Sequence, residues 1–207
     1  MKIFTSIKES LTTVTKMIVD EILVKVNKMF AAKKPPIEQI AKELLKKYIL
    51  AQPEMQETIS GNLRYELGIV DPMERILNII ENLVIDIKAD ISPVKIVGNS
   101  VKGGITIHLI DVDYSSVLTI PDAIVTTEKG ESLYWLRWLL LEGSQTIIGD
   151  YEVEFGAYGR TGGARMVRGG SWGVPSEFSG TREDNFITRA IEQMQPELIE
   201  KINQCLA

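Results

Sequence analysis

The strongest periodic pattern lies in residues 3–29, IFTSIKESLTTVTKMIVDEILVKVNKM. Apolar side chains recur at intervals of three or four positions, which is the spacing of one face of an α-helix. This face comprises Ile3, Ile7, Leu11, Val14, Ile18, Ile22, Val26 and Met29. Pro35 and Pro36 follow, and because proline lacks the backbone donor of a helix interior, the pair predicts a break. We therefore expect a helix within residues 1–34 that docks in a groove of a partner.

A second helical region is predicted over residues 35–82. Pro36 is suited to the first turn of a helix, and the apolar face that follows comprises Ile37, Ile40, Ala41, Leu44 and Tyr48. Further along, Asp71 and Pro72 form a typical N-cap and first helical residue. The first third of the chain is therefore expected to be mostly helical.

Strand patterns begin at about residue 83. Apolar and polar side chains alternate over residues 83–91 and 103–112, as in half-buried strands, and three shorter candidates cover 151–155, 164–168 and 171–174. Residues 181–207 then return to a helical period, with Thr181 and Asp184 in the positions of a loose capping box. The chain is thus predicted to be one α+β domain, 1–207, with helices packed on an antiparallel sheet within residues 83–180 and a C-terminal helix over 181–207.

An unusual helix is predicted between Ser132 and Glu142. Its sequence, SLYWLRWLLLE, leaves hardly any polar face, so it must be buried on most sides. The chain's own fold can supply this burial. A partner chain is the alternative, because Trp135 and Trp138 belong to the residue types that dominate interface hot spots.

Residues 156–173 contain seven glycines and three arginines, Arg160, Arg165 and Arg168. This composition predicts turns or a mobile loop, and it lacks the Gly-Lys-Ser/Thr sequence of a phosphate-binding loop. Three interpretations remain open: a solvated hairpin, a loop that orders against an acidic neighbouring chain, or a contact with DNA phosphates.

Residues suited to catalysis or metal binding are scarce. His108 is predicted to be an exposed strand residue without an orienting partner, and Cys205 continues an apolar helix face as a core or interface residue. Asp111 and Asp113 resemble a divalent-metal pair only weakly, because no further ligands follow at a suitable spacing. We therefore expect no enzyme activity, metal or cofactor.

The overall charge is −5, which gives no general indication of nucleic-acid binding. The longest apolar run, near residues 133–141, is shorter than the roughly 20 residues of a membrane-spanning helix. The first residues lack the apolar core of a signal peptide. We expect a protein that remains in the cytoplasm in which it is made and does not enter a membrane.

Several short motifs resemble those of bacteriophage tail-completion or neck proteins, which join the head to the tail. They are Gly61-Asn62-Leu63-Arg64, Tyr134 with Glu142-Gly143, Trp172-Gly173-Val174-Pro175 with Phe178 and Gly180, and Phe186-Ile187-Thr188-Arg189-Ala190-Ile191. The order of predicted helices, strands and glycine-rich loop is also similar to that family.

The resemblance implies a virion structural protein that forms a homo-oligomeric ring between the portal-connector stack and the tail tube or tail terminator. DNA would pass through the lumen without specific binding. In this interpretation the interface residues are Trp135, Trp138, Arg160, Arg165, Arg168, Trp172 and Phe186. The alternatives are a DNA-contacting module that uses the glycine-arginine loop, and an enzyme in which that loop is a lid.

Overall fold

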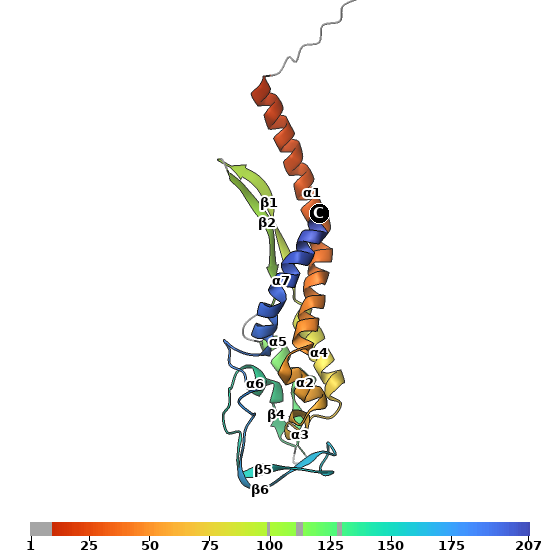
Figure 1. Ribbon diagram of the computed structural model, residues 1–207, viewed down its shortest axis with the longest axis vertical. Coiled ribbons are helices and arrows are strands. Elements are labelled where there is room, and N and C mark those ends of the chain that lie inside the picture. The colour runs from red at the N-terminus through yellow and green to blue at the C-terminus, as the bar shows by residue number, and fades with distance from the viewer. Residues whose placement is uncertain (1–9, 99, 111–113, 128–129) are drawn as a thin grey trace, which may run out of the picture.

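The first helix, α1 (Leu11–Leu50), runs for 40 residues, which corresponds to about 60 Å. The structure is a computed structural model and describes residues 10–98, 100–110, 114–127 and 130–207. Ser10 is the N-cap, because its side chain accepts a hydrogen bond from the backbone N–H of Thr13. One half of α1 packs in the body of the molecule and the other half projects from it (Figure 1).

The predicted break at Pro35 and Pro36 is wrong, because α1 continues through both residues. Each proline deprives the carbonyl four positions earlier of its helical donor. Those carbonyls belong to Ala31 and Ala32, which are exposed and can be hydrated. The C-terminal helix likewise continues through Pro196. In this chain, therefore, the prolines remove local hydrogen bonds but do not end the helices.

The remaining helices gather around the second half of α1 (Figure 1). They are α2 (Pro53–Ser60), α3 (Leu63–Glu66), α4 (Pro72–Val84), α5 (Ser115–Leu118), the 3-10 turn η1 (Pro121–Ala123), α6 (Trp135–Leu140) and α7 (Phe186–Leu206). Helix α7 packs along α1 in the opposite direction, since Gln52 bonds to Gln193 and Lys47 to Glu197.

The strands form three separate antiparallel pairs within the described residues. These are β1 (Lys88–Val97) with β2 (Ser100–His108), β3 (Val125–Thr126) with β4 (Ser132–Leu133), and β5 (Ile148–Phe155) with β6 (Ala164–Trp172). The predicted α+β class, with a long N-terminal helix, antiparallel strands and a C-terminal helix, is confirmed. The two strands predicted over 164–174 are one strand, β6.

Two predicted boundaries also shift. Residues 83 and 84 belong to α4, whose amphipathic pattern continues into the segment predicted as strand. The helix predicted from Ser132 shortens to α6, because Ser132 and Leu133 pair with β3.

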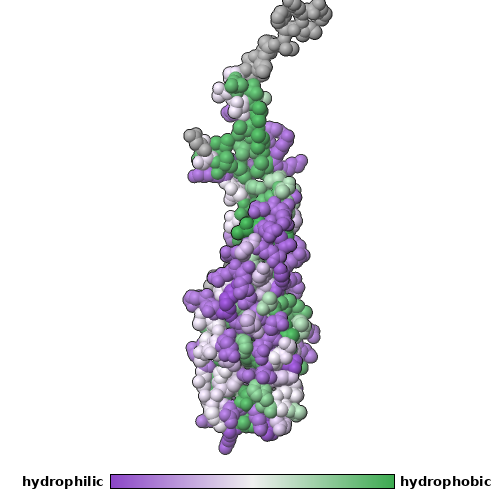
Figure 2. Space-filling model, viewed as in Figure 1, coloured by the Kyte–Doolittle hydropathy of each residue, from purple (hydrophilic) through white to green (hydrophobic). Residues whose placement is uncertain are grey.

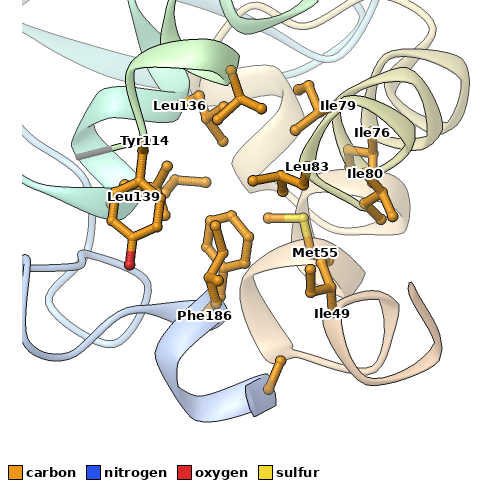
Figure 3. Close-up of a cluster of buried hydrophobic side chains, with 14 of the residues drawn as sticks. Ile49, Met55, Ile76, Ile79, Ile80, Leu83, Tyr114, Leu136, Leu139 and Phe186 are labelled. Carbon is orange, nitrogen blue, oxygen red and sulfur yellow. The ribbon is translucent and has the colours of Figure 1, made fainter. Parts of the chain in front are cut away.

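The main core lies where α1, α2, α4, α6 and α7 meet. The ring of Phe186, at the start of α7, lies among Met55 of α2, Leu83 of α4 and Leu139 of α6 (Figure 3). The buried Asn185 fixes this helix start, since its side-chain oxygen accepts from the backbone N–H groups of Ile187 and Thr188. Asn185, and not the predicted Thr181, is therefore the N-cap of α7.

Candidate functional site

The projecting half of α1 exposes apolar side chains that the rest of the described chain leaves uncovered. Within the described part of α1, the first buried residue is Ile37, whereas Leu11 is 85% exposed and Ile22 is 52% exposed. The tip of the β1–β2 hairpin adds Val101, which is 69% exposed. We call this region the distal surface, and it comprises Leu11, Met17, Ile18, Ile22 and Val24 of α1 with Ile96, Val97 and Val101 of the hairpin. Figure 2 shows hydrophobic residues gathered over this end.

The hairpin is fixed to α1 by paired hydrogen bonds. The Asn27 side chain donates to the carbonyl of Val94 at 3.0 Å and accepts from its N–H at 2.6 Å. Nearer the body, Glu38 accepts from the N–H of Ala89 at 2.8 Å. Val19 and Leu23 of α1 are half-buried, on the same side of the helix as Asn27. The hairpin therefore covers one side of the projecting helix and leaves the distal surface open.

The distal end is basic although the whole chain is acidic. Residues 10–36 and 91–105 hold seven of the 23 basic side chains and two of the 28 acidic ones. Lys95 and Lys102 stand directly opposite each other in the β1–β2 ladder. Like charges in this position are destabilising, and within the described chain neither lysine has a carboxylate partner. This end therefore favours an acidic binding partner.

A second exposed apolar region lies on α4, in the body. Met73 and Leu77 line an open pocket of about 600 Å³, together with Ile59, Arg64, Asp71, Pro72, Glu74 and Asn78. Asp71 and Glu74 have no basic partner among the described side chains. We call this region the α4 pocket. It combines exposed apolar surface with unpaired carboxylates.

The glycine-arginine segment forms the β5–β6 hairpin at the opposite end from the projecting helix (Figure 1). The segment therefore forms a hairpin, as one of the predicted alternatives required. Arg160 donates to the backbone carbonyls of Gly68 and Thr126, which fixes the turn to the body. Arg165 pairs with Glu154 of the same chain at 2.7 Å and lies over the ring of Tyr158. Arg168 is exposed and has no ion-pair partner in the described ranges.

The predicted aromatic interface residues lie in the chain's own core. Trp135 and Phe186 are fully buried, and Trp138 packs edge-to-face against Trp172 at 5.9 Å between ring centroids. The Trp172 indole donates to Glu66 at 3.0 Å, and burial raises the pKa of that carboxyl above its ordinary value. The chain's own fold thus buries α6, and none of these four side chains is more than 8% exposed.

Comparison with protein-family models, curated proteins and solved structures gives no match.

The described residues show little that is arranged for catalysis. His108 is exposed, as predicted, but it does have a partner: it pairs with the likewise exposed Asp90 at 3.1 Å across the β1–β2 ladder. No group of three or more metal-ligating side chains occurs within the described ranges. Asp111 and Asp113 lie outside the described residues. No helix in the described part of the chain is long and apolar enough to cross a membrane.

Sequence reasoning found the projecting helix but missed the hairpin tip and the α4 pocket. The sequence does contain a signal for the hairpin tip. Lys95, Val97 and Val101 are basic or apolar residues around the turn at Gly98, and they lie outside the predicted strands. The α4 pocket has no comparable signal, since Ile59 and Leu77 come together only in the folded chain.

Reversing the charge of Arg165 tests where its partner lies. Arg165→Glu should lower the free energy of unfolding by about 1 kcal/mol, because it places two carboxylates opposite each other in the β5–β6 ladder. The double variant Arg165→Glu/Glu154→Arg should recover that loss in urea denaturation. A single variant of unchanged stability but impaired assembly would instead place the partner carboxylate on a neighbouring chain.

Proposed function

We propose that the chain is a non-enzymatic structural subunit that repeats as a ring in the neck of a bacteriophage, between the head connector and the tail. The distal surface is the observation that carries this proposal. Monomeric proteins rarely expose contiguous apolar patches larger than a few hundred Å², and larger patches mark interaction sites. The neck is proposed as the place of assembly because short motifs in the sequence resemble those of neck proteins.

A DNA-contacting role for the β5–β6 hairpin is less well supported. Arg160 and Arg165 bond to groups of their own chain, which leaves Arg168 as the one arginine of the three without a partner among the described residues. Affinity for DNA rises with the number of phosphates neutralised, so a single arginine provides weak binding. This agrees with DNA passing through the ring without tight binding.

The proposed location is tested on tailed particles released by the host that encodes the chain. An antibody against the recombinant protein, coupled to gold, should label the junction between head and tail in electron micrographs. The tail tip or the head surface serves as an internal control for non-specific binding. Label elsewhere on the particle, or particles without the protein in mass spectrometry, would contradict the neck assignment.

Removal of residues 1–30 should abolish assembly but leave a folded chain. The deletion leaves in place all the buried side chains among the described residues of α1, so we expect a cooperative thermal transition and a helical circular dichroism spectrum. Size-exclusion chromatography with light scattering should then report a monomer. The variant Ile18→Ser/Ile22→Ser is the matched comparison. It keeps the helix and removes only exposed apolar side chains, so it separates the loss of apolar surface from the loss of the helix. A truncated chain that is wholly unfolded would make this helix part of the core.

A further inference from the structure

We propose that the distal surface of one copy binds the α4 pocket of the next copy, head to tail. This contact rests on the proposed ring and specifies how its subunits join. The distal surface is apolar and basic, whereas the α4 pocket is apolar and carries two carboxylates, Asp71 and Glu74, against one arginine, Arg64. The two regions are therefore both apolar and differ in the sign of their charge, which are the properties that make two surfaces complementary in a protein interface.

Charge favours this pairing over the contact of two distal surfaces. The distal ranges hold seven lysines, with Asp20 and Glu21 as their acidic residues, whereas the rest of the chain holds 16 basic and 26 acidic side chains. Two distal surfaces placed together would juxtapose like charges, which disfavours the contact. The acidic body of another copy provides the opposite charge, and Asp71 and Glu74 place it beside apolar Met73 and Leu77.

The position of the two regions requires two copies. The distal surface lies on the projecting half of α1, and α4 lies beside the other half, within the body (Figure 1). Since the continuous helix α1 holds them at different distances along its length, the two surfaces of one chain do not meet. Each copy then keeps one free surface of each kind, and such a heterologous contact continues until it closes into a ring or forms a filament.

The available area suits a specific contact. The distal surface contains eight aliphatic side chains that are about half exposed or more. Leu11, Ile18 and Ile22 share one side of α1 and Met17 and Val24 share another, so the contact must cover more than one side of the projecting helix. The flanking lysines and the backbone of the hairpin tip can supply the remaining polar area.

Two charge variants test the contact by complementation. Lys95→Glu/Lys102→Glu makes the distal end acidic, and Glu74→Lys/Asn78→Lys makes the α4 pocket basic. Each variant alone should weaken self-association on the order of 100-fold in sedimentation velocity, because like charges then face each other. An equal mixture of the two should recover association to within about tenfold of the natural chain, since reversed surfaces then face their opposites.

A matched control is Glu192→Lys/Gln195→Lys, which makes the same change in charge on exposed positions of α7. This control should associate like the natural chain. The proposal is overturned if the natural chain remains monomeric at all concentrations, if the mixture stays as weak as its components, or if the α7 control loses association equally. It is also overturned if anionic lipid vesicles bind the natural chain but not Lys95→Glu/Lys102→Glu while self-association is unchanged, because the distal end is then a membrane-binding surface.

These outcomes are separate from the neck assignment. Gold label at the head–tail junction with failed complementation would leave the proposed function intact and reject this contact. Restored association in the mixture, with no label on particles, would support the contact and reject the neck assignment.

Discussion

Phe186→Ala should lower the free energy of unfolding by about 3–5 kcal/mol, the usual cost of removing a buried aromatic ring from a core. The ring is 0% exposed and lies among side chains of α2, α4 and α6 (Figure 3). Its removal leaves a cavity at the junction of these helices and weakens the attachment of α7. Urea denaturation followed by circular dichroism measures the effect.

Phe155→Ala is the matched control, because this phenylalanine on the β5–β6 hairpin is 48% exposed. We expect it to change stability by much less than Phe186→Ala. The comparison distinguishes a core role for Phe186 from the interface role predicted from sequence. A Phe186→Ala chain of normal stability that fails to assemble would restore the interface interpretation.

Arg189→Ala should destabilise the chain by about 2–3 kcal/mol near pH 8, because it leaves the buried Glu54 carboxylate without its partly exposed cationic partner. Arg189 of α7 bonds to the carboxylate of Glu54 on α2, which is 1% exposed, and also to exposed Asp184. Glu54 Oε2 is buried without a hydrogen-bond partner among the described residues. Without Arg189, the Glu54 charge would be buried and unpaired.

The cost should decrease as the pH falls. Burial raises the pKa of Glu54 above its ordinary value even beside Arg189, and removing the arginine raises this pKa further. Because the folded-state pKa then exceeds the unfolded-state pKa, protonation stabilises the folded state, and this stabilisation is lost as the pH rises through the folded-state pKa. Denaturation of the variant and the natural chain from pH 5 to pH 8 measures the difference.

The double variant Glu54→Gln/Arg189→Ala provides the control. It removes the carboxylate, so it should recover much of the stability at pH 8 and lose the pH dependence of the Arg189→Ala difference. If both variants are equally destabilised at every pH, the guanidinium acts through packing or through Asp184, and the buried charge is not the cause.

Sequence patterns predicted the existence of the helices and strands better than they predicted where each one begins and ends. The period of apolar residues in 3–29 is a local property of the chain, and it identified α1 within the described residues. The continuation of α1 past Pro35 depends on the packing of Ala41, Leu44 and Leu45 against the body, which cannot be seen in the local sequence. The separation of the strands into pairs likewise depends on tertiary contacts.

The residues of the candidate site were likewise predicted correctly only where the pattern is local to the sequence. The apolar face of the N-terminal helix was predicted to bind a partner, because its residues have no apolar contacts within the predicted helix itself. Trp135 and Trp138 were predicted at an interface because tryptophan is common there, and Phe186 because of the resemblance to neck proteins, but the same residue types fill cores. Sequence does not distinguish these two environments, because both bury large apolar side chains. The partners of Arg160 and Arg165 depended on the hairpin register, which sets Glu154 opposite Arg165.

The prolines inside α1 have a mechanical consequence. Both lie between the projecting half of the helix and the half held by the core, and each removes one of the hydrogen bonds that give a helix its bending stiffness. Elastic deformation of α1 is therefore concentrated at Pro35 and Pro36. In the proposed ring, a small change of angle at this point, repeated in every subunit, would alter the curvature, so the same contacts could fit circumferences of different size.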